Sequence, residues 1–307
     1  RARAELNNTN VSGKGRKIAV ALRPSYIQRS GEASFSLPKL FNTDWQADIS
    51  TTAEFQKKPG YTLRERSGNL SLGRQWEKNL NLIVTLSGSY SKLSNIKVIG
   101  EQRKPLSRKY LLSTSLAYDT RNSLFNTTRG IYGSITQHLG KLYRDGLRTY
   151  AKTDATLSLF TPLSSRTGIG TSLRIGYIYL KGGISHIPLN DRYYAGGPNT
   201  IRGFRHNRAG PRDEEGNPSG GTLRIIWNAA EVETRIYKMI GGAVFIDCGN
   251  VWSTPAHLNR DGFRVSPGIG IRVNTPLGVG RLDWAFNPFP RPGEPTQQVF
   301  LNIGQVF

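Results

Sequence analysis

The segment GGPNTIRGF, residues 196–204, contains the residues of this chain best suited to a specific polar interaction. Arg202 stands beside Gly203, and Gly196 and Gly197 precede it. A guanidinium presents a rigid fork of N–H donors that fits a carboxylate through two hydrogen bonds. Because glycine has no side chain, it lets a backbone approach another surface closely. The segment therefore predicts a loop that delivers a cation to a negatively charged group.

Other kinds of chemistry find no support in the residue pattern. Cys248 is the single cysteine, which excludes an intramolecular disulfide and a cysteine-based zinc cluster. No Ser/His/Asp grouping is visible, and the acidic run 213–215 is typical of a solvated loop tip. The four histidines have no metal-ligand spacing; they are His138, His186, His206 and His257. We expect no catalytic residue, no metal site and no cofactor, and hence no enzyme.

The elements that must position the loop alternate between apolar and polar residues. In LNLIVTLSGSY, residues 80–90, the leucines at 80, 82 and 86 share one face, whereas Asn81, Thr85 and Ser87 share the other. This period of two predicts strands, and many of them are about ten residues long. A polar face of this kind cannot form a dry core but can line a water-filled lumen. No run of 18 apolar residues suggests a membrane-spanning helix.

Fifteen segments carry this pattern and predict an all-β fold, a transmembrane antiparallel up-and-down β-barrel. They are residues 2–9, 16–26, 32–41, 44–57, 61–75, 79–93, 109–121, 130–140, 148–161, 168–180, 222–237, 241–252, 263–275, 279–287 and 297–307. Bacterial single-chain barrels have even strand numbers. We therefore expect 16 strands, with the first strand upstream of Arg1. No internal boundary is visible, so residues 1–307 are expected to form a single barrel domain.

Four motifs in order resemble those of the Omp85 superfamily. They are GGPNTIRGF, then VFIDCGNVW at 244–252, PGIGIRVNTPLGVGRLDWAF at 267–286 and FLNIGQVF at 300–307. The resemblance implies a sixteen-stranded barrel that follows periplasmic POTRA domains, which we expect upstream and absent from this chain. It also implies a bacterial outer-membrane location and a weak lateral seam between the first and last strands.

The resemblance assigns roles to particular residues. The sixth outer loop folds into the lumen with Ile201, Arg202, Gly203 and Phe204, and Arg202 pairs with an acid of the inner wall. Asp247 is the expected partner, because Val244, Ile246 and Cys248 occupy the apolar face of its strand. Glu233 is a second candidate. Leu223, Ile225 and Trp227 share the parity of Glu231 and Glu233, so a bulge is needed, or an upper half of the strand that stands above the membrane.

The terminal strand provides the second expected site. Its residues at the lateral seam are Val299, Leu301, Ile303, Gly304 and Phe307. An unpaired strand edge is a template for another chain's strand. The resemblance therefore predicts a factor that inserts unfolded β-barrel proteins into the membrane, with possible accessory periplasmic or lipoprotein subunits. The alternative is a two-partner-secretion pore that exports an unfolded polypeptide. A diffusion porin would leave the four motifs unexplained.

The chain is strongly basic, with a formal net charge of +21. Nucleic-acid binding would concentrate Lys and Arg with aromatics on one module. Here the basic residues are spread over turns and polar faces. This distribution favours outer-membrane lipids and anionic glycolipid as partners and excludes nucleic acid.

Overall fold

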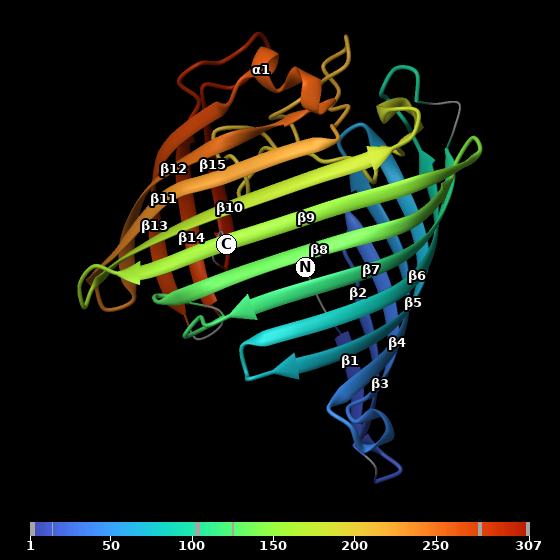
Figure 1. Ribbon diagram of the computed structural model, residues 1–307. Coiled ribbons are helices and arrows are strands. Elements are labelled where there is room, and N and C mark those ends of the chain that lie inside the picture. The colour runs from blue at the N-terminus through green and yellow to red at the C-terminus, as the bar shows by residue number, and fades with distance from the viewer. Residues whose placement is uncertain (1–3, 14, 102–104, 125, 276–277, 305–307) are drawn as a thin grey trace. The chain divides into compact units, whose positions relative to one another are not determined.

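The computed structural model describes residues 4–13, 15–101, 105–124, 126–275 and 278–304, in which fifteen strands follow one another in sequence order in one sheet (Figure 1). The strands are β1 Ala4–Val11, β2 Arg16–Arg23, β3 Gln28–Leu37, β4 Trp45–Lys58, β5 Tyr61–Trp76, β6 Leu80–Ser94, β7 Leu106–Asp119, β8 Gly130–Tyr143, β9 Leu147–Pro162, β10 Thr167–Leu180, β11 Leu223–Tyr237, β12 Ile240–Trp252, β13 Arg264–Thr275, β14 Gly278–Phe286 and β15 Gln297–Ile303. The described ladders are antiparallel.

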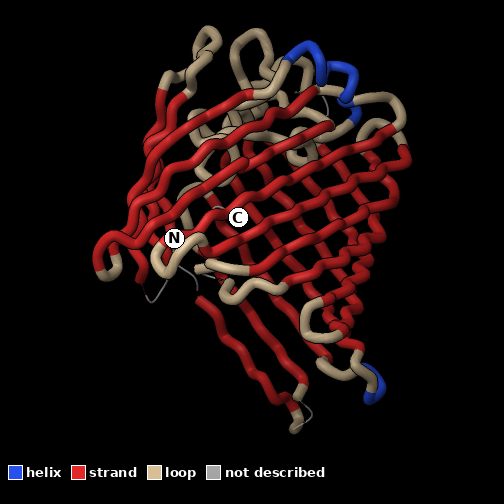
Figure 2. The backbone as a smooth tube through the Cα atoms, turned by 60° about the vertical axis from the view of Figure 1, so that its left-hand side comes forward, coloured by secondary structure: helices blue, strands red, loops and turns tan. Residues whose placement is uncertain are grey.

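Helical residues form only short segments in the described part of the chain (Figure 2). These are η1 Leu40–Asn42, η2 Ile184–His186, η3 Pro255–His257 and α1 Leu258–Asp261. None of the described helices is long and apolar enough to cross a bilayer.

The all-β, antiparallel up-and-down organisation expected from the alternating pattern is confirmed. The short helices lie between strands, where alternation provides no signal. A strand before Arg1, a single barrel domain over 1–307 and upstream POTRA domains stay predictions.

Two compact units divide the chain, and we describe each by itself. The N-terminal unit comprises Arg1–Ala117, Thr136–Thr153 and Ile178–Asp191. The C-terminal unit comprises Tyr118–Ile135, Asp154–Tyr177 and Arg192–Phe307.

In the N-terminal unit, the sheet has one apolar and one polar face. Leu70 pairs with Ile49 on one side and with Leu86 on the other, and all three side chains are exposed. On the opposite face Asn69 donates to the Ser50 hydroxyl at 3.2 Å. A continuous exposed apolar face of this kind marks contact with a membrane or another apolar partner.

The C-terminal unit has the same division, but its polar face is buried and charged. Trp227, Val244 and Trp284 are exposed on the apolar side, whereas Asp247 and Asp283 are buried. The interior of this unit is therefore held by ionic groups as well as by apolar packing.

A β-bulge in β11 switches the direction of its side chains. Asn228 pairs with Asp247 in β12 while Ala230 pairs with Ile246, so β11 contains one extra residue between them. The β10–β11 ladder shifts at the same level. The bulge resolves the parity conflict noted above, because Trp227 and Glu231 now point to opposite faces.

Trp252 differs from the other aromatic residues near strand ends. We expect Tyr90, Tyr110, Tyr118, Tyr177, Tyr179 and Trp252 at the membrane interfaces. The five tyrosines are exposed, but Trp252 has no exposed surface and packs edge-on against Phe263, with ring centroids 5.3 Å apart. The expectation for Trp252 is therefore wrong, because a residue of the segment after β12 covers its ring.

The exposed apolar face generates a stability prediction. Leu86→Arg is expected to lower the free energy of unfolding in lipid vesicles by about 2–4 kcal/mol, the cost of a cation on the lipid face at mid-membrane. Ser67→Arg, on the polar face of β5, should cost much less. Urea unfolding followed by gel mobility measures both. Equal costs would mean that the apolar face does not contact lipid.

Candidate functional site

From Arg192 onward, the loop that follows β10 belongs to the C-terminal unit and has a compact fold of its own. Tyr193 and Gly221 exchange backbone hydrogen bonds of 2.9 and 3.0 Å and close residues 193–221 at their base. Within the loop, the Thr200 amide donates to the Gly197 carbonyl at 3.2 Å. The turn at Gly197, where φ is 105°, turns the backbone toward the IRGF residues.

Arg202 is held by Asp247 of β12 through a bidentate pair. Its Nε and Nη2 donate to the two carboxylate oxygens of Asp247 at 2.7 and 2.8 Å, and its backbone amide donates at 3.1 Å. Neither residue has any exposed surface. The three contacts fix the backbone and the side chain of the loop to the same carboxylate.

Two more acids surround the same guanidinium. The Nη1 atom of Arg202 donates to Glu231 at 2.8 Å and lies 3.7 Å from a carboxylate oxygen of Asp283. The Phe245 ring lies beneath the guanidinium, with 3.2 Å from its carbon to the ring centroid. Burial lowers the pKa of Arg202, but the Asp247 contacts and the charges of Glu231 and Asp283 outweigh burial and raise the pKa overall. Arg202 is therefore permanently charged.

Arg272 of β13 links the acids to one another. Its guanidinium donates to Glu231 at 2.5 Å, to Asp283 at 2.6 Å and to Glu233 at 2.9 Å. The expected pairing of Arg202 with Glu233 is therefore replaced by pairing with Glu231. The bulge in β11 and the depth of the loop bring Arg202 level with Glu231, whereas Glu233 lies two residues, roughly 7 Å, farther along the strand.

Polar groups on β10 and β11 complete the cluster. The Asn228 amide donates to Asp247 at 2.7 Å and to the Thr200 carbonyl at 3.0 Å. Arg174 donates to the Asn228 side chain at 2.6 Å and to the Asn199 carbonyl at 2.7 Å. The loop backbone is thus bonded to the wall at two carbonyls just before Arg202.

Sequence reasoning missed several members of this cluster. Arg272 and Asp283 both lie inside the 267–286 motif quoted above. The presence of charged residues without an assigned role in a recognised motif is the signal that could have identified them. Asn228 and Arg174 carried no such signal, because isolated polar residues on a strand usually line a wall without a specific partner.

Two glycines leave the space that the cluster needs. A Cβ on Gly203 would lie 2.5 Å from the Phe286 carbonyl oxygen and 2.6 Å from the Ser266 hydroxyl. A Cβ on Gly270 would lie 2.5 Å from Asp283 and 2.6 Å from Arg272. Close packing therefore requires a glycine directly after Arg202 and the second glycine of the G-x-G motif.

The apolar residues of the IRGF motif are also buried. Ile201 and Phe204 have no exposed surface. The Arg264 guanidinium carbon lies 4.9 Å from the Phe204 ring centroid, and Arg264 also forms an ion pair with Glu294. The four motif residues therefore contact the wall through charge, close backbone approach and apolar packing.

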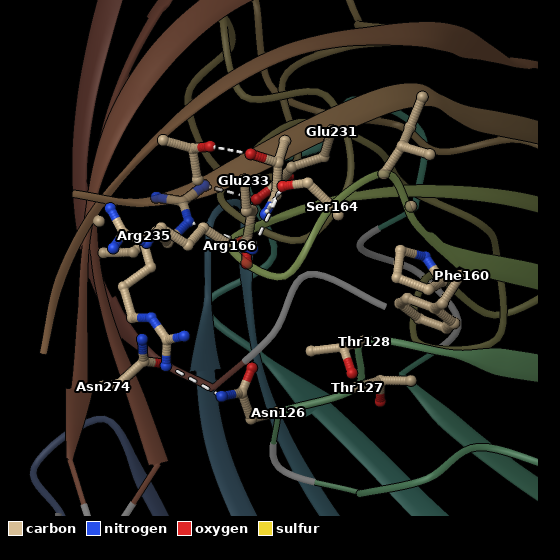
Figure 3. Close-up of a pocket in the computed structure, with 18 of the residues that line it drawn as sticks. Asn126, Thr127, Thr128, Phe160, Ser164, Arg166, Glu231, Glu233, Arg235 and Asn274 are labelled. Atoms are coloured by element: carbon tan, nitrogen blue, oxygen red, sulfur yellow. Dashed lines mark hydrogen bonds and ion pairs between the residues drawn. The ribbon is translucent and has the colours of Figure 1, made fainter. Parts of the chain in front are cut away.

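A cavity of 370 Å³ borders the cluster (Figure 3). Glu231, Glu233 and Arg272 form part of its lining, together with Arg166 and Arg235. The cavity separates the ionic cluster from the turn between β9 and β10. Arg272 bonds both glutamates of the lining, whereas Arg235 donates to the Ser165 carbonyl at 3.5 Å. The ion pairs on this side of the cavity thus belong to the cluster that supports the loop.

The terminal strand β15 pairs with β14 and is the last strand of the sheet. Leu301 and Ile303 are each 80% exposed, compared with 42% for Leu282, which pairs with Leu301 on β14. Val299 is exposed as well, and the Gly304 amide donates to the Val279 carbonyl at 2.7 Å. Phe307 lies outside the described residues. The described part of β15 therefore has the exposure of an edge strand.

The chain belongs to the Omp85 superfamily, because the sequence profile described as the Omp85 superfamily domain matches residues 10–307. The fold agrees with a crystal structure of BamA from Haemophilus ducreyi lacking POTRA domains 1–3. The TM-score is 0.81 at 18% identity, over 97% of this chain and 65% of that one. The predicted transmembrane β-barrel class is thereby confirmed. CdiB from Escherichia coli matches with a TM-score of 0.61 at 12% identity, over 97% of this chain and 58% of that one.

Similar sequences come from different kinds of organism. The sorting and assembly machinery component 50 homolog of Mus musculus is 35% identical over 68% of this chain and 45% of its own length. The outer membrane protein assembly factor BamA of Nitratidesulfovibrio vulgaris is 30% identical over 43% of this chain and 17% of its own length. The chain therefore spans less than half of these relatives. The fold and family assign it to an integral outer-membrane barrel.

The cluster predicts strong coupling between Arg202 and Asp247. Arg202→Met and Asp247→Leu are each expected to lower the free energy of unfolding by about 3–5 kcal/mol, because each leaves a buried charge without its partner. The loss of unfolding free energy in the double variant should be smaller than the sum of the two single losses by at least roughly 1 kcal/mol. Denaturant unfolding of the four proteins in detergent measures the cycle.

The control cycle combines Arg202→Met with Glu214→Gln at the exposed loop tip. These two effects should add within about 0.5 kcal/mol. Additivity in the Asp247 cycle as well would mean that the buried pair contributes no specific interaction energy.

The close approach at Gly203 predicts a change in loop protection. Gly203→Ala should displace the loop, because the new methyl group would overlap the Phe286 carbonyl. Trypsin is then expected to cleave near Arg205 and Arg208 at least several-fold faster. Gly168→Ala, whose Cβ would meet nothing nearer than 3.7 Å, is the control. Unchanged cleavage in Gly203→Ala would mean that the loop accommodates the methyl group without leaving the wall.

Proposed function

We propose that this protein assembles outer-membrane proteins, inserting unfolded β-barrel clients at a lateral seam formed by the terminal strands. The observation that carries the proposal is the edge character of β15, with Leu301 and Ile303 each 80% exposed. A strand edge offers unpaired N–H and C=O groups to an incoming strand. A client can therefore gain its first backbone hydrogen bonds at β15.

The relatives support an assembly role over simple diffusion. The names of the mouse and Nitratidesulfovibrio vulgaris proteins both contain the word assembly. The fold is also closer to BamA, with a TM-score of 0.81, than to CdiB from Escherichia coli, with 0.61. We propose a bacterial outer membrane as its location, with β-barrel clients, periplasmic POTRA domains and accessory subunits.

In the proposed mechanism, the loop after β10 keeps β11, β12 and β14 in one arrangement while β15 pairs with the incoming client strand. Arg202 ties the loop to β12 through Asp247 and to β11 through Glu231, and Asp283 of β14 lies close to the same guanidinium. β14 in turn carries β15 on its other edge. The buried cluster thus braces the strand that supports the edge. No covalent chemistry is required, so we do not propose an enzyme, and the step needs no cofactor.

A secretion pore is the competing function. It would use the lumen as a polypeptide channel, and the loop would then have to move out of the path. The three contacts between Arg202 and Asp247 oppose such a movement. We therefore favour the loop as a brace rather than a gate.

The test is reconstitution of the natural protein carrying this chain into liposomes. We expect an unfolded barrel client to fold faster than in empty liposomes, as measured by its gel-mobility shift. Arg202→Ala should reduce this acceleration by at least roughly tenfold if the brace contributes the 1.4 kcal/mol or more that this factor represents.

The matched control is Arg205→Ala, which removes an exposed arginine from the same loop. Its acceleration should equal that of the unaltered protein. No acceleration by the unaltered protein, together with large ion conductance, would instead support the secretion pore. Normal acceleration by Arg202→Ala would remove the loop from the mechanism.

A further inference from the structure

A group of cations lies on the apolar face of the N-terminal unit, on strands β3–β6. Figure 1 labels these four strands. Arg29, Phe55, Arg64 and Lys92 are cross-strand neighbours in one row. Arg66 follows Arg64 two residues along β5, on the same face. All four cationic side chains are exposed. They lie beyond the row that contains Leu70 and Leu86, toward one end of the strands.

These cations repel one another. Lys92 lies directly opposite Arg64, and like charges placed opposite each other on neighbouring strands are destabilising. Within the described chain, no carboxylate lies within ion-pair distance of Arg64, Arg66 or Lys92. The nearby acids face the other side, where Glu54 accepts from Gln28 at 2.9 Å and Glu65 accepts from Ser91 at 2.6 Å. The row is therefore electrostatically incomplete.

Aromatic rings orient the cationic groups. The guanidinium carbons of Arg29 and Arg64 each lie 5.8 Å from the Phe55 ring centroid. This arrangement holds two guanidinium groups beside one ring. The Arg29 Nε donates to the Ser25 carbonyl at 3.3 Å, which leaves its two Nη groups as donors beside those of Arg64. Such donors match the oxygens of a phosphate group.

Small residues form a track between the cations and the middle of the apolar face. Gly31 and Ala53 pair in the row of Arg66, and Ala33, Thr51, Gly68 and Gly88 form the next row. A Cβ on Gly68 would meet no atom within 4 Å, so open space lies above it. A groove of 720 Å³ on these strands is lined by residues that include Gly31, Ala53, Phe55, Arg64 and Arg66.

We propose that this groove binds an anionic, phosphate-bearing lipid of the surrounding membrane. The phosphate lies among Arg64, Arg66 and Lys92, with Arg29 beside Phe55 at the edge. One acyl chain follows the track over Ala53 and Gly68 toward Leu70. Charge complementarity selects the head group, and the apolar setting selects a lipid over a soluble phosphate. The volume matches that of small-molecule sites. The proposal does not depend on assembly activity.

The test measures lipid binding to the intact, detergent-solubilised protein by native mass spectrometry. Phosphatidylglycerol, phosphatidylcholine and lipid A are titrated separately. Phosphatidylglycerol or lipid A should bind well above phosphatidylcholine. The triple variant Arg64→Gln/Arg66→Gln/Lys92→Gln should weaken anionic-lipid binding by roughly 100-fold, on the scale of three basic residues near a membrane surface.

Two further variants separate charge from shape. Gly68→Leu retains every cation but fills the track, and it should reduce binding of the same lipid. Arg74→Gln removes another cation of β5, which lies beside Trp45 and Trp76 at 5.9 and 5.1 Å from their ring centroids. Arg74→Gln should leave the binding unchanged. The triple variant is also expected to be more stable than the unaltered protein in neutral detergent, because the repulsion is removed.

The separate titrations of lipid A and phosphatidylglycerol identify which lipid supplies the phosphate. Binding of lipid A alone, lost in the triple variant, would assign the groove to a phosphorylated glycolipid. Binding of phosphatidylglycerol, lost in the same way, would assign it to a glycerophospholipid. Equal binding of phosphatidylcholine and the anionic lipids, or unchanged binding in the triple variant, would overturn the proposal.

Discussion

The buried charge of Arg202 is the interaction on which the C-terminal unit depends. A guanidinium with no exposed surface is costly unless its charge is paired and hydrogen-bonded. Asp247 and Glu231 meet that requirement through three strong side-chain contacts. The acids would in turn repel one another, and Arg272 offsets this repulsion by bonding Glu231 and Asp283. The loop therefore cannot leave the wall without taking away the arginine that pairs with the buried Asp247.

This electrostatic constraint explains features of the backbone. The extra residue in β11 turns Asn228 and Glu231 to the same side of the sheet although they are three residues apart. Without the bulge, one of them would face the apolar side. Gly203 allows the loop backbone to lie against Phe286 and Ser266, which sets the depth at which Arg202 enters. The bulge in β11 and the absence of a side chain at Gly203 thus determine where the Arg202 guanidinium lies.

The sequence predicted the strands well because alternation acts within a single strand and is visible locally. It also indicated that Arg202 would seek an acid on the wall, since the motif and the parity of Asp247 are both local. The choice between Glu231 and Glu233 was not accessible, because it depends on the register of β11 against β12 and on the depth of the loop. Arg272 was missed for the same reason, since its partners come from β11 and β14. Trp252 was misassigned because contact with Phe263 decides its burial.

Two pairs of arginines, one in each unit, have opposite surroundings. In the C-terminal unit, Arg202 and Arg272 are buried and matched by acids, so they contribute to a fixed internal structure. In the N-terminal unit, Arg64 and Arg66 are exposed on an apolar face with Lys92 beside them. A cation at that position is favourable only if the environment provides an anion, and a membrane provides one at the level of its head groups. Arg64, Arg66 and Lys92 therefore contribute positive charge to the apolar face, where the proposed lipid supplies the anion, whereas Arg202 and Arg272 are paired with acids that hold the loop.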